Sequence, residues 1–199
     1  MRLTRQMASS KNLSLLSGLL LLQLSGCTAT STEDNDTTNT FVTIVSMAST
    51  DGDDLSSDVC VGTGGACTVF NDIGTVVMVA QVKNLKDVSS PVNDIVFTRY
   101  RVTYIRADGR NVPGVDVPYP FDGVANFRVP RDQTQATRTF LLVRVQAKLE
   151  SPLNELAGLG GSLVISTIAR VDFFGQDLAG RQIQVTGFIN VTFADFADS

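Results

Sequence analysis

Apolar and polar residues alternate along most of the chain from Phe41 onward. Successive side chains of a strand point to opposite faces, so alternation over several residues is typical of half-buried strands in antiparallel sheets. The pattern therefore predicts a chain built mainly from strands. It is clearest in residues 76–83, 96–104, 140–149, 163–173 and 183–193.

The same alternation predicts which side chains face the core. Polar residues between the apolar ones, such as Arg99 and Lys148, are expected on the opposite face. The residues expected to face inward are Val96, Tyr100, Val102 and Tyr104 in residues 96–104, and Leu141, Val143, Val145, Ala147 and Leu149 in residues 140–149.

Turn-forming residues separate the predicted strands. Asp108-Gly109 precedes a proline-rich loop, and residues 177–180 link the last two strands. Only residues 151–158 look helical, because Ser151 could cap a helix there and Gly158 could end it.

These elements together predict an all-β fold. Each sheet must bury one face, so about seven strands with one short helix favour a single two-layer antiparallel β-sandwich over residues 41–199. The hairpin in residues 171–185, with Asp-Leu-Ala-Gly near its turn, resembles the last hairpin of immunoglobulin-like and fibronectin-type-III-like extracellular domains. That resemblance implies an immunoglobulin-like sandwich and transfers no functional residue.

The start of the chain has a different pattern. Arg2, Arg5 and Lys11 precede a leucine-rich run over residues 13–24, which is the layout of a secretory leader. A membrane-spanning helix would need about 20 apolar residues, and a core helix would be amphipathic, so both alternatives fit less well. A start at Met7 would leave Lys11 as the basic residue and the same interpretation.

The leader ends in Leu24-Ser25-Gly26-Cys27, which resembles the lipobox of bacterial lipoproteins. The resemblance implies a diacylglycerol on the Cys27 thiol, cleavage after Gly26 and acylation of the new amino terminus. Thr28 stands where an Asp would signal retention in the inner membrane in that family. The resemblance therefore implies a lipid-anchored protein of the cell envelope, with the outer membrane favoured.

Residues 28–40 (TATSTEDNDTTNT) hold no large apolar side chain. Such a segment cannot bury enough surface to offset its chain entropy, so we expect a flexible tether. The predicted organisation is a leader over residues 1–26, a lipid-anchored tether over 27–40 and a β-sandwich domain over 41–199.

Charge is uneven along the chain. Residues 28–58 hold seven acidic residues and no Lys or Arg, whereas acidic and basic residues balance over residues 59–199. A balanced domain has no strong field to attract nucleic acid. We therefore expect no nucleic-acid partner. The expected partners are the membrane, through the lipid, and a candidate envelope protein.

Cys60 and Cys67 enclose a short glycine-rich segment. In an exported protein such a pair is expected to form a disulfide. Zinc binding is the alternative, but the chain has no histidine and two thiolates make a poor zinc site. A thioredoxin-like redox role would need a two-residue spacing.

Two groups of residues are candidate binding sites. Asp51, Asp53, Asp54 and Asp58 could hold calcium, but their spacing departs from the helix-loop-helix calcium pattern, and a solvated acidic loop is the alternative. The proline-rich loop over residues 107–123 carries Tyr119 and Phe121, which could anchor a partner or could fold back as a lid on the core.

The chain carries no catalytic motif. Histidine is absent, and no nucleophile elbow, phosphate loop or metal-ligand cluster occurs. A hydrolase that uses paired carboxylates is the remaining enzymatic alternative, with Asp172 as the one acid inside an apolar strand. We expect no cofactor and a non-catalytic structural or protein-interaction role. The alternative is a ligand-binding module for carbohydrate or calcium.

Overall fold

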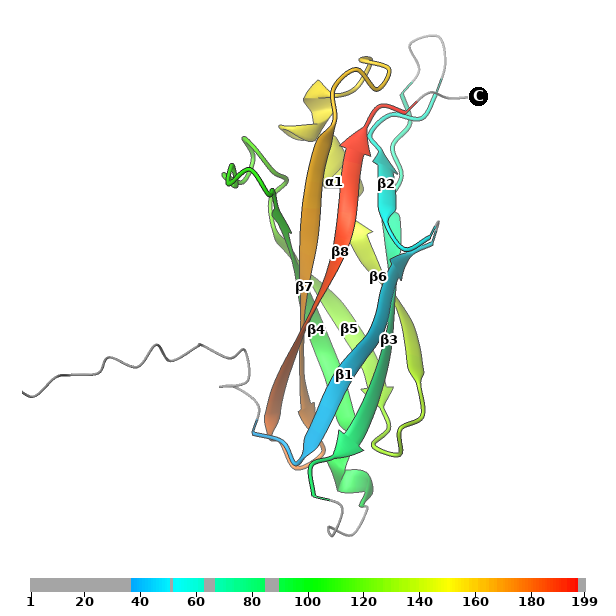
Figure 1. Ribbon diagram of the computed structural model, residues 1–199, viewed down its shortest axis with the longest axis vertical. Helices are drawn as coiled ribbons and strands as arrows, with labels where there is room; N and C mark the ends of the chain where they lie inside the picture. The colour runs from blue at the N-terminus through cyan, green and yellow to red at the C-terminus, as the bar shows by residue number, and fades with distance from the viewer. Residues whose placement is uncertain (1–36, 51, 63–66, 85–89, 197–199) are drawn as a thin grey trace, which may run out of the picture.

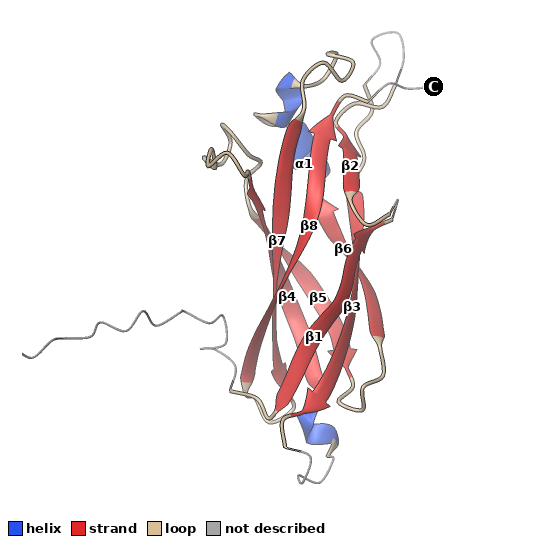
Figure 2. Ribbon diagram, in the orientation of Figure 1, coloured by secondary structure: helices blue, strands red, loops and turns tan. Residues whose placement is uncertain are grey.

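Two stacked sheets form the molecule seen in Figure 1, a computed structural model that describes residues 37–50, 52–62, 67–84 and 90–196. Cys27 and the predicted leader lie outside these residues. The described part is an elongated two-layer β-sandwich, as the sequence predicts, with short helical segments confined to its two ends (Figure 2).

Eight strands make up the two sheets. One sheet has the order β1-β3-β6 and the other the order β2-β8-β7-β4-β5. All neighbouring strands are antiparallel except β2 and β8, which are parallel, a pairing that the alternation pattern did not predict. The strands are β1 (Thr40–Ser49), β2 (Leu55–Asp58), β3 (Asp72–Val82), β4 (Ile95–Ile105), β5 (Phe121–Val129), β6 (Ala136–Val143), β7 (Ile165–Asp177) and β8 (Gln182–Ala194).

The core lies between the sheets and follows the predicted alternation over most strands. Val76, Met78 and Ala80 of β3 are fully buried, as are Val191 and Phe193 of β8. Aromatic rings fill the centre, where edge-to-face pairs are favourable. These rings are Phe97, Tyr100, Phe127, Phe140 and Phe173, and the pairs among them that include Phe97 or Tyr100 have centroids 5.3–6.2 Å apart.

The prediction for the start of β4 is wrong by one residue. Phe97 is fully buried and Val96 is only partly buried, because the register shifts between Phe97 and Arg99 in the pairing of β4 with both neighbours. A β-bulge inserts one extra residue into a strand and so changes which side chains share a face. Tyr100, beyond the bulge, faces the core as predicted.

The predicted strand over residues 140–149 extends only as far as Val143, and within it Leu142 is fully buried whereas Leu141, predicted to face inward, is only partly buried. The chain then forms α1 (Val145–Lys148), and the helical turn buries Lys148 while Leu149 is left 56% exposed. This reverses the predicted faces of these two residues. The reversal arises because side chains alternate between faces in a strand but not in a helix. In α1 the neighbouring residues 147 and 148 both point inward.

The predicted helix over residues 151–158 is also wrong. Turns and one short 3-10 segment, η2 (Leu153–Glu155), occupy this stretch. The Ser151 hydroxyl donates to the Glu155 carboxylate (2.8 Å), and the N-cap residue of η2 is Pro152, which makes no side-chain cap bond. Leu153 and Leu156 are fully buried, so tertiary packing holds the segment in place of regular helical bonds.

The two ends of the sandwich hold different helical segments and loops (Figure 1). The described chain begins at Thr37, whose N–H donates to Gln182 of β8 (3.0 Å), at the end that also holds η1 (Pro91–Asn93) and the β7–β8 turn. The other end holds α1 and the long loops. Within the described residues, no helix has the length and apolar character needed to cross a membrane.

Candidate interaction surface

The loops gather at the end of the sandwich that carries α1. We call this region the loop end and define it by residues 59–62, 67–71, 106–120 and 144–164, which lie together at the upper end in Figure 1. The segments come from both sheets, because each follows or precedes a strand that ends there. The loop end therefore depends on the stacking of the two sheets.

Internal hydrogen bonds order the loop over residues 106–120. Asp108 accepts from the side chains of Arg106 (2.7 Å) and Arg110 (3.0 Å), and the Arg106 bond in particular holds the pKa of this carboxyl below its usual range. The Asp116 carboxylate accepts from the Val112 N–H (3.1 Å). A loop without regular structure is thus fixed by its own side chains.

Tyr119 and Phe121, predicted as partner anchors or as a lid, differ in position. Tyr119 is 50% exposed and its ring lies against Gly114, where a φ of 76° and the space both require glycine. Phe121 is the first residue of β5 and is buried. Its ring meets Tyr100 edge-to-face (6.3 Å), and the Arg144 guanidinium lies over it (4.6 Å). Of the two, only Tyr119 presents its ring to solvent.

Large apolar side chains are exposed in each segment of the loop end. Scattered single cases are normal on protein surfaces, but a concentration of them marks interaction sites. The sequence pattern missed Leu149 because it assigned this residue to the inner face of a strand, and it placed Leu163 and Val164 within the predicted strand over residues 163–173. The exposed apolar residues here are Val61, Phe70, Val112, Val115, Tyr119, Leu149, Leu159, Leu163 and Val164.

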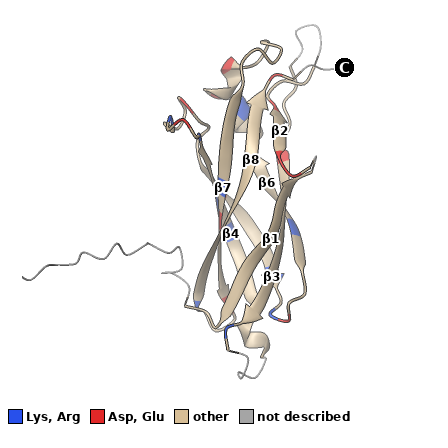
Figure 3. Ribbon diagram, viewed as in Figure 1, with Lys and Arg blue, Asp and Glu red and all other residues tan. Residues whose placement is uncertain are grey.

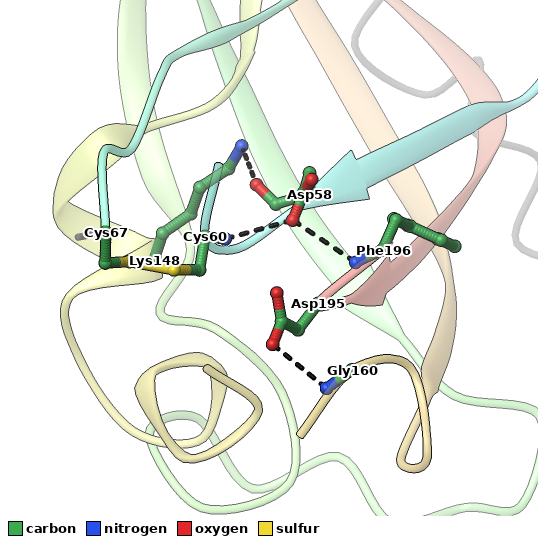
Figure 4. The surroundings of a disulfide bond; sticks show 7 residues. All are labelled: Asp58, Cys60, Cys67, Lys148, Gly160, Asp195 and Phe196. Atoms are coloured by element: carbon green, nitrogen blue, oxygen red, sulfur yellow. Dashed lines mark hydrogen bonds between the residues drawn. A yellow bond between two sulfur atoms is a disulfide. The ribbon is translucent and has the colours of Figure 1, made fainter. Parts of the chain in front are cut away.

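The predicted disulfide joins Cys60 and Cys67 at the loop end (Figure 4). Next to it, the Asp58 carboxylate accepts from the backbone N–H groups of Cys60 (3.0 Å) and Phe196 (3.4 Å). The Asp195 carboxylate accepts from the Gly160 N–H (3.0 Å). Together these bonds connect the segment after β2, the segment after β8 and the turn at Gly160.

Lys148 is a buried cation beside this disulfide (Figure 4). Its ammonium donates to the backbone carbonyl of Asp58 (2.7 Å) and to the Asp72 carboxylate (3.1 Å). Ser57 donates to the same carboxylate (2.6 Å). A buried ammonium requires partners of this kind. The sequence offered no signal for this pair, because 76 residues separate its members.

The three candidate calcium ligands that the structure describes, Asp53, Asp54 and Asp58, form no metal-binding group. Asp51 lies outside the described residues, and Asp53 and Asp54 are exposed. Asp54 accepts from the Asn190 amide (3.0 Å), whereas Asp58 accepts from backbone N–H groups. Among the described residues, no group of three or more His, Cys, Asp or Glu side chains could hold a metal ion.

Asp172 lies on the outer face of the five-stranded sheet and is nevertheless buried. One of its oxygens accepts from the Arg170 guanidinium (2.9 and 3.1 Å) and the other accepts from the Thr186 hydroxyl (2.7 Å). Its hydrogen bonds therefore join β7 to β8. Figure 3 shows acidic and basic residues scattered over a ribbon that is mostly uncharged.

Comparison with known proteins adds no family to this description. No protein-family model matches the chain, and no curated protein matches it.

Proposed function

We propose that this protein is a lipoprotein of the cell envelope, anchored through Cys27, with the outer membrane favoured, whose β-sandwich binds a partner protein and catalyses no reaction. The observation that carries the interaction role is the set of nine exposed apolar side chains at the loop end. Apolar and aromatic residues such as Tyr119 are typical of the buried centres of protein interfaces.

The position of Thr37 indicates that the loop end would point away from the lipid anchor. The described chain begins at the end opposite the loop end (Figure 1). A lipid on Cys27 would sit only nine residues before Asp36, so the loop end would be the part of the domain farthest from the point of attachment. A tether of this kind reaches about 20 Å on average, enough for the loop end to meet a partner in the envelope.

The strand order supports the resemblance to immunoglobulin-like domains. The consecutive strands β1 and β2 lie in opposite sheets, and β7 lies between β8 and β4 in the larger sheet. Such crossings between sheets are a feature of Greek-key sandwiches. Fold alone does not define a partner, so the interaction role depends on the loop end.

Replacement of Cys27 tests the anchor. Cys27→Ala should block maturation or release the protein from membranes, because it removes the acylated thiol. The double variant Cys60→Ser/Cys67→Ser is the matched control and should remain with membranes. A Cys27→Ala protein that is processed and still fractionates with membranes would show that the anchor proposal is wrong.

Crosslinking tests the interaction role separately. A photocrosslinking residue at Val115 or Leu159 should give a discrete adduct in the native envelope, and one at Val124 should not, although Val124 is 83% exposed on β5. Tyr119→Ser should reduce the adduct formed from position 115. Equal labelling from positions 115 and 124 would contradict a specific role for the loop end.

A further inference from the structure

The bulge in β4 creates an unusual local surface on the outer face of the five-stranded sheet. Thr98 and Arg99 are consecutive and both exposed, between buried Phe97 and Tyr100. In a regular strand, one of two consecutive residues would point inward. Bulges in sheets re-aim side chains and are concentrated near functional sites. Here the bulge places a hydroxyl and a guanidinium side by side.

Stacking fixes the orientation of Arg99. Its guanidinium carbon lies 3.7 Å from the ring centroid of Phe174 on β7, a cation–π geometry. A guanidinium held flat in this way loses less conformational freedom when it binds a planar group.

The charge of Arg99 is only weakly matched by its neighbours. Its nearest carboxylate, that of Asp122, lies 3.4 Å away and is already paired more closely with Arg101, at 2.9 Å. Asp172, the next acid on this face, pairs with Arg170. Arg99 therefore retains capacity to bind an anion, since the guanidinium offers five N–H donors.

A groove of about 570 Å³ lies beside this arginine. Its volume is within the range of small-molecule sites, about 300–1,000 Å³. None of the described residues that line it is acidic. The polar lining groups besides Arg99 are Thr37, Thr98, Gln176, Gln182 and Gln184.

The glutamine amides of the groove are partly ordered and partly available. The Gln182 amide nitrogen donates to the Gln176 amide oxygen (2.9 Å), and the Gln184 amide nitrogen donates to Asp172 (3.4 Å). Within the described structure, the Gln176 amide nitrogen and the Gln184 amide oxygen make no hydrogen bond, which leaves a donor group and an acceptor for a ligand. Sugar hydroxyls can both donate and accept, so they suit such a mixed lining.

We infer that this groove binds a carboxylate-bearing sugar of the uronic acid class, with Arg99 holding the carboxylate and the glutamine amides holding the ring hydroxyls. The inference is independent of the lipid anchor and of the loop end. Arginine and carboxylate form a bidentate pair that matches the planar fork of both groups. This proposal places the carbohydrate ligand of the alternative function on the sheet face, away from the loop over residues 107–123.

Titration calorimetry of the full chain with glucuronate tests the site. We expect saturable binding that weakens as salt is added, and much weaker binding of glucose, which lacks the carboxylate. Acetate supplies the carboxylate without the sugar and should also bind more weakly. Absence of saturable glucuronate binding, or equal binding of glucose or of acetate, would overturn the inference.

Variants locate the binding on the groove. Arg99→Gln should weaken glucuronate binding at least tenfold, the typical effect of losing a charge-assisted pair. Arg99→Lys should bind with intermediate affinity, because it keeps the charge and loses the planar fork. The matched control is Arg110→Gln, an exposed arginine at the loop end, which should bind as the wild type does. Arg99→Gln protein that folds normally and binds with wild-type affinity would place the sugar elsewhere and contradict the proposal.

Discussion

The Tyr100 hydroxyl of β4 donates a hydrogen bond to the backbone carbonyl of Leu141 (3.1 Å) and accepts one from the N–H of the same residue (3.0 Å). Leu141 belongs to β6, which is an edge strand of the other sheet. A single phenol thus crosses the core and satisfies two backbone groups that an edge strand would otherwise leave unpaired. The contact joins the two sheets through a polar bond inside an aromatic cluster.

Removal of this hydroxyl should destabilise the domain. Tyr100→Phe leaves the Leu141 N–H and carbonyl without their partner, so we expect the free energy of unfolding to fall by about 1–3 kcal/mol. Urea denaturation followed by circular dichroism measures the change. Tyr119→Phe is the control, because that ring is half exposed, and it should change stability little. Equal stability of Tyr100→Phe and wild type would show that the bridge adds nothing.

A second tyrosine of β4, Tyr104, should make the stability of the domain depend on pH in the alkaline range. The Tyr104 hydroxyl donates to the Leu142 carbonyl (2.7 Å), and burial raises its pKa above the ordinary value of 10.0. The unfolded chain releases this proton at a lower pH than the folded protein does. Stability should therefore be intact below pH 10 and should fall as the pH rises above it. Denaturation midpoints across this range should decline less steeply for Tyr104→Phe than for wild type, and parallel declines would contradict the argument.

The buried Lys148–Asp72 pair should be sensitive to loss of either member. Lys148→Met removes the ammonium and leaves the Asp72 carboxylate in a largely buried site, so we expect a loss of about 3 kcal/mol or more. Lys148→Met/Asp72→Asn should recover part of that loss, because no unpaired charge remains. Lys83→Met, at an exposed position at the end of β3, is the matched control for chemical denaturation. A loss as small as that of the control would show that the pair is not buried in solution.

The Cys60–Cys67 disulfide closes a short loop, with a sequence separation of 7. A crosslink of this length restricts the unfolded chain enough to stabilise the fold by about 2–3 kcal/mol. The double variant Cys60→Ser/Cys67→Ser should lose about this amount in guanidinium denaturation, and reduction of the wild type should give the same loss. Free thiols at both positions in exported protein would contradict the disulfide in the native molecule.

Truncation of Tyr119 and Phe121, predicted as partner anchors or as a lid on the core, should show which of them packs in the core and which lies on the surface. Phe121→Ser opens a cavity beneath Arg144 and should cost about 3–5 kcal/mol. Tyr119→Ser should leave the thermal midpoint almost unchanged, since half of that side chain is in solvent. Thermal unfolding of both variants measures the difference. Equal midpoints for the two variants would mean that Phe121 does not belong to the core.

Local pattern determined the overall architecture of this protein. Alternation in β3 and β8 specified which side chains meet between the sheets. A strand with one buried face must alternate apolar and polar residues, so the sequence of each short segment indicates its inner face. The disulfide was predictable for a similar reason, since its two cysteines lie close together in the sequence. The predicted anchor at Cys27 likewise depends on a contiguous motif and on no distant contact.

The tertiary structure decided the features that depend on distant partners. Alternation at 96–104 could not reveal that β4 inserts a residue against both of its neighbours, so the exposed pair of Thr98 and Arg99 was invisible in the sequence. Lys148 could turn inward only because β3 supplies Asp72, and no local signal records a partner 76 residues away. Local periodicity specifies an element and its faces, whereas bulges and buried charges are set by the neighbours that the fold brings together.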